Sequence, residues 1–247
     1  MSVTIFGKES HLVFDPKLCS AAFRQSNTLT LDQITHLLRE AVGATKSDLD
    51  VLYMYMPESS GMSSIKDDGR RAIAEVRRSA SGHLMGDNLT ELRAVFTKTL
   101  NANLEKVFPK DSSSSFDWAP LDLCEFLKKQ GTMAATTTLF GPNLPNIWPE
   151  LSDDTFSLEE RVPYLITKVP KSVQPDLYRT RDRALNALMQ WQKDATENRN
   201  LEELAEENPL WDEYWGARFT RHRHEIFKKN GISKMGRATE DLLFIWG

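Results

Sequence analysis

The chain has too few cysteines for a disulfide framework or a structural zinc site. Its 247 residues include only two cysteines, Cys19 and Cys124, and neither belongs to a C-x-x-C pair or lies near a pair of histidines. Structural zinc sites and disulfide-stabilised folds need closely spaced ligands or many cysteines. We therefore expect no metal site, and two isolated thiols fit a reducing compartment.

Long hydrophobic runs are also missing. A helix that crosses a bilayer needs about 18 or more consecutive apolar residues, and the sequence has no such run. Residues 1–9 are too polar and too short to contain the apolar region of a signal peptide. We therefore expect neither a membrane span nor a signal peptide in this chain.

Neither sign of charge dominates the composition. The net charge is −4, and the charged residues, 27% of the chain, are interspersed. No broad basic surface is expected, which argues against a nucleic-acid partner. G-x-S-x-G, G-x-G-x-x-G and P-loop motifs are absent too, so the usual sequence grounds for a hydrolase, a dinucleotide enzyme or an NTPase are missing.

The apolar residues recur mainly at spacings of three and four, which predicts a mainly α-helical fold. The clearest period runs from Leu89 to Val107, and we expect its apolar stripe to lie in the core. Prolines at 163, 170 and 175 predict a broken, flexible segment between residues 158 and 173. A short β-hairpin is predicted from residues 3–6 and 11–14. Further helices are predicted at residues 17–24, 121–139, 176–195 and 210–229.

The chain stops inside an apolar run that reads as the beginning of a helix. Ser233 is available as its N-cap, and Leu242, Leu243 and Trp246 fall on one face. No later residue covers this face. We therefore expect residues 242–246 to be left in water and the isolated chain to be poorly folded or to self-associate.

Several segments, in this order, resemble cytochrome P-450 enzymes of the branch that holds the sterol 7α-hydroxylases, prostacyclin synthase and many fungal relatives. Residues 3–17 resemble the hairpin that leads into helix B, and residues 82–92 resemble helix C. Residues 136–141 resemble the end of helix E, and residues 237–247 the opening of helix I, which crosses the haem. The resemblance implies a mainly α, partial cytochrome P-450 fold. Residues 1–247 would then be a single incomplete domain that lacks the haem-ligand half.

The resemblance also implies a function for the complete protein. It would be a haem-dependent monooxygenase, or a haem-thiolate isomerase, that acts on a hydrophobic sterol, lipid or secondary metabolite. A flavoprotein reductase would be its partner, and such enzymes usually lie on the endoplasmic reticulum membrane facing the cytosol. The family's axial cysteine lies in F-x-x-G-x-x-x-C, a context that neither Cys19 nor Cys124 has. We therefore expect this chain alone to bind no haem, to hold no catalytic residue and to be inactive.

Candidate binding residues follow from the same resemblance. Many members bind a haem propionate through W-x-x-x-R, but no tryptophan here has an arginine four residues later. His83, with Arg77 and Arg78, becomes the candidate cofactor-binding group, and a solvated or helix-capping role is the alternative. These two arginines, with Arg70 and Arg71, are candidates for reductase docking. The predicted substrate-binding residues are those of the loop after helix B, for which ordinary core and loop is the alternative: Tyr53, Met54 and Met56.

One cluster invites a metal or phosphate interpretation. In the run Arg221-His222-Arg223-His224-Glu225 the two imidazoles would point about 200° apart on a helix, so they cannot share a metal ion. We predict a solvated helix face here. Against the monooxygenase stands a second hypothesis from another class, a haem-free helical interaction or lipid-binding module that keeps this part of the fold.

Overall fold

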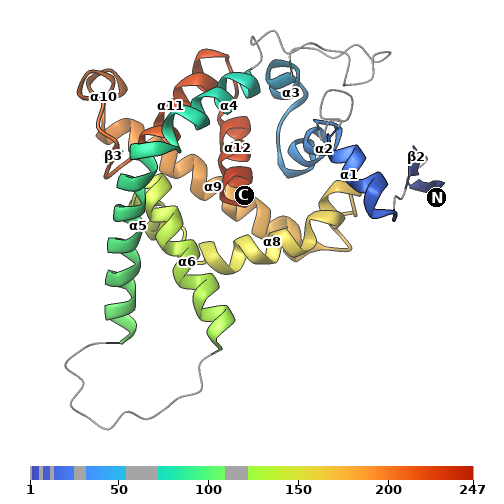
Figure 1. Ribbon diagram of the computed structural model, residues 1–247, viewed down its shortest axis with the longest axis horizontal. Coiled ribbons are helices and arrows are strands. Elements are labelled where there is room, and N and C mark those ends of the chain that lie inside the picture. Colours follow the sequence, from blue (N-terminus) through green and yellow to red (C-terminus); the bar gives the residue numbers. More distant parts are fainter. Residues whose placement is uncertain are drawn as a thin grey trace.

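The structure is a computed structural model that describes residues 2–5, 8–11, 14–24, 32–53, 72–108 and 122–246. Within these ranges it is mainly α-helical, as the sequence predicts (Figure 1). The elements are β1 (Ser2–Ile5), β2 (Lys8–His11), α1 (Pro16–Arg24), α2 (Asp32–Val42), α3 (Lys46–Tyr53), α4 (Ala72–His83), α5 (Gly86–Val107), α6 (Leu123–Phe140), α7 (Asn143–Ile147), α8 (Leu151–Ile166), α9 (Pro175–Asn198), α10 (Leu201–Glu207), β3 (Trp211–Asp212), β4 (Gly216–Ala217), α11 (Arg218–Lys229) and α12 (Lys234–Trp246).

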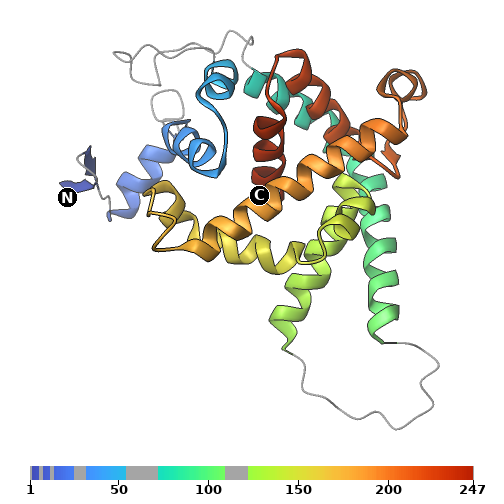
Figure 2. The same ribbon diagram turned by 180° about the vertical axis from the view of Figure 1, so that it is seen from behind.

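The largest core cluster forms around α9 and α12. The long helix α9 crosses the molecule and packs against α12, whose C-terminal end lies near the centre (Figure 2). Trp191 of α9 is fully buried, and its indole Nε1 donates to the carbonyl oxygens of Phe140 at 2.9 Å and Tyr214 at 3.1 Å. Because Phe140 ends α6 and Tyr214 lies between β3 and β4, this one side chain ties both segments to the core.

A second core cluster lies between α3, α4 and α11. Buried side chains from these helices, among them Leu52, Val76 and Phe227, pack together. Phe244 of α12 contacts both clusters, so α12 joins the two parts of the core.

The helix predicted from residue 89 to residue 107 is confirmed as α5, but its apolar side is less buried than predicted. Leu92 is 4% exposed, whereas Leu89 is 50% and Val107 is 44% exposed. The helix pairs with α6, and both project away from the rest of the molecule (Figure 1). The expectation of a core stripe over five turns is therefore wrong, because periodicity identifies the apolar side of a helix but not the length that a neighbour covers.

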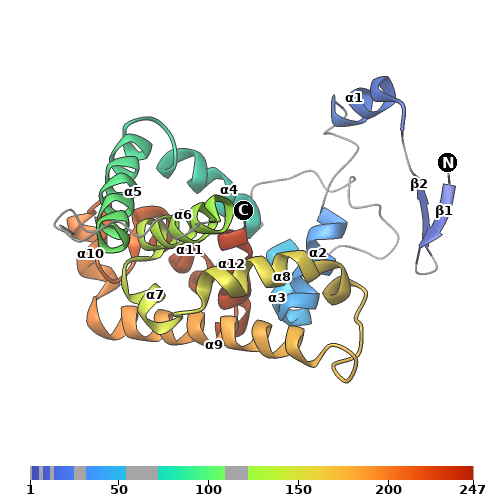
Figure 3. The same ribbon diagram turned by 90° about the horizontal axis from the view of Figure 1, so that it is seen from below.

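The N-terminal hairpin is present in a different register from the one predicted. Ile5 pairs with Lys8 and Ser2 with His11, so the second strand begins three residues earlier than expected. The register is set by pairing between the two strands, which the β-propensity of each segment alone does not specify. The hairpin and α1 lie at one edge of the molecule (Figure 3). Asp15 caps α1 as expected, because its carboxylate accepts from the backbone N–H of Lys17 at 2.7 Å.

The segment with three prolines is more regular than predicted. Helix α8 runs through Pro163 to Ile166, so the expectation of broken pieces from residue 158 is wrong for this part. Leu158 and Leu165 lie seven residues apart on one face and are both buried in the core. Their burial outweighs the hydrogen bond that Pro163 removes in the last turn.

The predicted helix 210–229 begins eight residues later than expected. Trp211–Asp212 and Gly216–Ala217 form a small antiparallel sheet, and α11 starts only at Arg218. Asp212 holds the turn, since its Oδ1 accepts from the backbone N–H groups of Tyr214 at 2.9 Å and Trp215 at 3.0 Å. Gly216 has φ +68°, and a Cβ there would lie 2.4 Å from the carbonyl oxygen of Leu139, so the close approach to α6 requires glycine.

The last helix is covered more fully than predicted. Ser233 is its N-cap, with Oγ accepting from the backbone N–H of Gly236 at 2.9 Å, as expected. Leu242 is fully buried, and residues 243–246 are partly buried against the main core cluster. The expectation that residues 242–246 are left in water is therefore wrong, because α6, α8 and α9 surround this helix.

Candidate functional site

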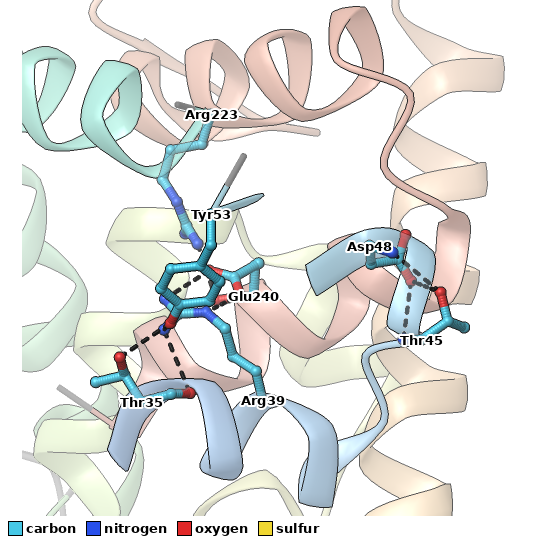
Figure 4. Close-up of polar contacts among 7 residues, drawn as sticks. All are labelled: Thr35, Arg39, Thr45, Asp48, Tyr53, Arg223 and Glu240. Carbon is cyan, nitrogen blue, oxygen red and sulfur yellow. Dashed lines mark hydrogen bonds and ion pairs between the residues drawn. The ribbon is translucent and has the colours of Figure 1, made fainter. Parts of the chain in front are cut away.

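Two adjacent acidic residues on α12, Glu240 and Asp241, are buried and form the centre of the candidate site. Neighbouring positions on a helix point about 100° apart, so the two carboxylates meet different partners. Glu240 faces α2 and α3 (Figure 4), while Asp241 faces α9 and α11.

Glu240 forms a two-point ion pair with Arg39 of α2. Nε of Arg39 lies 2.5 Å from Oε1 and Nη2 lies 3.1 Å from Oε2, and the side chains are 12% and 4% exposed. Nη1 of Arg39 donates to the hydroxyl of Tyr53 at 2.8 Å, and this hydroxyl lies 2.9 Å from Oγ1 of Thr35. Burial opposes the charged guanidinium, but its attraction to Glu240 and its hydrogen bond with that residue raise the pKa of Arg39 above its usual value.

Arg223 of α11 reaches α12 from the opposite side. Its Nη2 donates to the main-chain oxygen of Glu240 at 2.8 Å, and its Nη1 lies 3.4 Å from Oδ1 of Asp241. The Nη1 contact is close enough for an ion pair but is not aligned for a hydrogen bond. The guanidinium carbon lies 4.4 Å from the ring centroid of Phe244 and 5.5 Å from that of Phe227, so aromatic faces cover much of this charge.

Asp241 is the most strongly perturbed acid in the network. Burial raises the pKa of Asp241 to about 6, although the positive charge of Arg223 and a hydrogen bond from Gln192 Nε2 at 2.8 Å act in the other direction. A carboxyl group with this pKa can hold or release a proton near neutral pH.

A third buried acid, Asp48, fastens the start of α12 to α3. Its Oδ2 accepts from the backbone N–H of Thr45, the residue before α3, at 3.0 Å. Its Oδ1 accepts from the backbone N–H of Ser233 at 2.7 Å. These hydrogen bonds outweigh burial and lower the pKa of Asp48. A Cβ on Gly236 would lie 2.6 Å from Cγ of Asp48, so this approach of α12 requires glycine.

The prediction of a solvated face for residues 221–225 is wrong. Arg221, Arg223 and His224 are all buried. The His224 ring packs against the Trp215 ring with tilted planes and centroids 4.7 Å apart. Burial, with the charges of Arg237 and Lys228, lowers the pKa of His224 to about 3. Sequence reasoning missed this because the acidic partner of Arg223 lies on another helix. The one available signal is Glu240-Asp241, two adjacent acids directly before the apolar run 242–246.

The predicted cofactor-binding residues lie together on α4, a helix that packs against α11. Arg77 and Arg78 are exposed, and His83 ends the helix with its ring 5.2 Å from that of His222. Burial, followed by the charges of His222 and Arg218, lowers the pKa of His83. Nδ1 of His83 is buried without a hydrogen-bond partner in the described part of the chain. Cofactor binding by this group stays a prediction.

The predicted substrate-binding residues are only partly described. Tyr53 is buried at the end of α3, with its hydroxyl engaged by Arg39 and Thr35. Met54 and Met56 lie outside the described residues, as do Arg70 and Arg71 of the docking prediction. Substrate binding by Tyr53 stays a prediction, and its contacts favour a structural role.

The described residues do not fit the axial ligand of the haem that the resemblance implies. Neither cysteine is in a disulfide; Cys124 is exposed in the first turn of α6, and Cys19 lies on α1 at the edge of the molecule. A haem thiolate needs an enclosed position beside the macrocycle. Searching the described ranges for three or more His, Cys, Asp or Glu side chains that could hold a metal ion finds no group.

The network therefore acts as a buried clamp on α12. Arg39, Arg223 and Asp48 contact this helix from three neighbouring elements, and no catalytic nucleophile or metal group accompanies them in the described ranges. The network can hold α12 in one position, and Asp241 can carry one proton. Among the described helices, none is both long and apolar enough to cross a bilayer.

The chain is similar to two curated fungal proteins. It is 26% identical over 241 residues to the cytochrome P-450 monooxygenase efuG of Hormonema carpetanum, which covers 96% of the chain and 40% of that relative. It is 35% identical over 132 residues to the cytochrome P-450 monooxygenase fsoE of Humicola fuscoatra, covering 53% of the chain and 23% of that relative. The chain thus spans less than half of either relative. No protein-family model and no solved structure matches it.

Proposed function

We propose that this chain, which belongs to the cytochrome P-450 family, is the N-terminal portion of a haem-dependent monooxygenase acting on a hydrophobic substrate. The observation that carries the proposal is the alignment with a fungal monooxygenase along 96% of the chain. The substrate class would be a sterol, a fatty-acid derivative or a fungal secondary metabolite. Haem would supply the oxygen-activating chemistry in the complete protein, and this chain would contribute helices around it.

In this proposal the charged clamp has a positioning role. A helix that crosses a haem must keep its angle and its depth, and three ion-paired or capped contacts from α2, α3 and α11 fix both for α12. Buried pairs of this kind specify one arrangement more than they add stability. Arg39, Asp48 and Arg223 are therefore positioning residues and not catalytic ones.

The chain alone is expected to be inactive and to bind haem weakly or not at all, because neither cysteine is placed to serve as a thiolate ligand. Hemin is titrated into the purified chain, reduced and exposed to carbon monoxide. We expect no Soret band of the thiolate type. Such a band from this chain would contradict the proposed division of the protein into a helical portion and a haem-ligand portion.

The proposal also predicts the gene sequence downstream of codon 247. The reading frame is expected to continue into an acid–threonine pair and then F-x-x-G-x-x-x-C. Sequencing the full transcript tests this directly. The longer product, expressed with a flavoprotein reductase, should give the thiolate-type carbon monoxide spectrum, and a stop codon directly after Gly247 in every transcript would overturn the proposal.

Cofactor and partner contacts are proposed for α4. His83, with Arg77 and Arg78, would meet a haem propionate or, for the arginines, an acidic reductase surface. The unpartnered Nδ1 of His83 supports the first role and the exposure of the two arginines the second. Replacing both arginines by glutamine should raise the reductase concentration needed for half-maximal turnover of the longer product, leaving its carbon monoxide spectrum unchanged. By its family such a protein would lie on the endoplasmic reticulum membrane.

The second candidate is a haem-free helical interaction or lipid-binding module. One observation favours it: Leu242 is fully buried and residues 243–246 are partly buried within the described chain, so the core closes over this helix. Light scattering on the purified chain separates the candidates. A compact monomer supports the helical module. Concentration-dependent self-association supports the first proposal, in which the rest of the monooxygenase covers the apolar surfaces of this chain.

A further inference from the structure

A groove of about 610 Å³ lies between α9, α11 and α12, on the side of α12 that Asp241 faces. Helix α9 contributes Gln192, Lys193 and Glu197 to its lining, α11 contributes His224 and Lys228, and α12 contributes Lys234 and Arg237. Its volume falls in the range of small-molecule sites, roughly 300–1,000 Å³. The haem proposal assigns no role to this groove.

The lining carries an excess of positive charge in a chain whose net charge is −4. The one carboxylate in the lining, Glu197, lies 3.9 Å from Nζ of Lys193 and offsets it. Lys228, Lys234 and Arg237 remain, and within the described residues none of them has an ion-pair partner within 4.0 Å. Positive charges gathered in a concave surface raise the local concentration of anions.

Two nitrogen atoms of residues that line the groove also lack partners. Nε of Arg237 and Nδ1 of His224 are buried with no hydrogen bond in the described part of the chain, although Nη1 of Arg237 donates to the carbonyl oxygen of Ile232 at 2.6 Å. A buried polar atom without a hydrogen-bond partner is uncommon, because it lowers the stability of the fold unless a ligand or a water molecule pairs with it. After burial itself, the charges of Arg237 and Lys228 are what lower the pKa of His224, which reports positive potential at this position.

We propose that the groove binds the phosphate group of a small molecule. Lys228 contributes charge from α11, and Lys234 and Arg237 contribute charge from α12. Three cations on two helices suit a phosphate dianion, which has three acceptor oxygens. The amide of Asn186 and the amide oxygen of Gln190, whose Nε2 donates to Asp194, also line the groove and offer neutral hydrogen bonds to the rest of the ligand. A soluble phosphomonoester and a phospholipid headgroup share this chemistry.

The test is a calorimetric titration of the purified chain with inorganic phosphate and with pyrophosphate, at constant ionic strength set with chloride. We expect saturable binding at one site. The variant Lys228→Gln/Lys234→Gln should weaken it at least tenfold, because both side chains are exposed and their loss leaves the core intact. Lys106→Gln/Lys229→Gln removes the same charge from exposed positions outside the groove and should leave binding unchanged.

Two further measurements identify the source and confirm the place. Flotation with phosphatidylcholine vesicles containing phosphatidic acid distinguishes a lipid headgroup from a soluble ligand, and vesicle binding counts only if Lys228→Gln/Lys234→Gln abolishes it. Phosphate in the groove should also raise the pKa of His224, followed by its ring proton resonances, because the anion offsets the charges of Lys228 and Arg237. The absence of saturable binding to both phosphate and vesicles, or equal losses in the two double variants, overturns the proposal.

Discussion

Replacing Arg39 by methionine is the most direct test of the clamp on α12. The substitution keeps most of the aliphatic volume but leaves the carboxylate of Glu240 buried without its two-point partner. Two charges about 4 Å apart attract by about 4 kcal/mol at an effective dielectric constant of about 20. Removing one member of a buried pair typically costs about 3–5 kcal/mol.

The cost should fall at the lower end of that range, about 3 kcal/mol, because Arg223 remains beside Glu240 and its positive charge offsets part of the loss. A domain of this kind is stable by about 5–15 kcal/mol, so the change is readily measured. The assay is urea unfolding followed by tryptophan fluorescence, for which the fully buried Trp148, Trp191 and Trp215 are internal reporters.

The same helix provides a matched control. Glu40 of α2 pairs with Lys168 at 2.8 Å, but these side chains are 41% and 63% exposed. Glu40→Gln should therefore cost less than about 1 kcal/mol. The double variant Arg39→Met/Glu240→Leu removes both buried charges and should recover at least half of the loss. If Arg39→Met unfolds within about 0.5 kcal/mol of the parent, or the double variant is no better than the single one, the argument for a buried ion pair fails.

Four further predictions concern other parts of the fold. Asp241 binds its proton more tightly in the folded chain, with a pKa of about 6, so its contribution to stability falls as pH rises from about 4 to 6, and Asp241→Asn should remove this slope in urea unfolding. His224, with a pKa of about 3, acts oppositely: its contribution is lost as pH falls below about 6.5, and His224→Phe should reduce acid sensitivity. Leu92→Ala should cost about 2–4 kcal/mol and Phe96→Ala, which is only partly buried, about 1 kcal/mol; equal thermal shifts would contradict the burial pattern of α5. Gly236→Ala should cost about 1–3 kcal/mol by calorimetry, since its methyl group meets the carboxyl that caps α3, and an unchanged melting temperature would refute that close approach.

The parts of the fold that the sequence predicts are those whose signals are local. Helix α9 follows from apolar residues at helical spacing, and the starts of α1 and α12 follow from Asp15 and Ser233, whose side chains cap the helix that they precede. Each signal lies within one or a few turns. The signals that identify these elements therefore lie within the elements themselves, and they can be recognised without knowing what packs around them.

The candidate site depends on partners that no local pattern reveals. Arg39 and Glu240 are 201 positions apart, and Asp48 and Ser233 are 185 apart. A charged run such as residues 221–225 looks the same in sequence whether it faces water or a buried acid on another helix. The prediction that this run is solvated fails for this reason. Most charged side chains are exposed, and only the tertiary partner decides which of them are buried.

The long separation of these partners also affects how the chain can fold during synthesis. At about 5–20 residues per second, the ribosome adds Glu240 roughly 10–40 s after Arg39. For most of that interval the carboxylate that neutralises Arg39 and the Ser233 N–H that donates to Asp48 have not yet been made. The ion pair of Arg39 and the hydrogen bond from Ser233 to Asp48 therefore form only when α12 docks, after α2 and α3 have already been made.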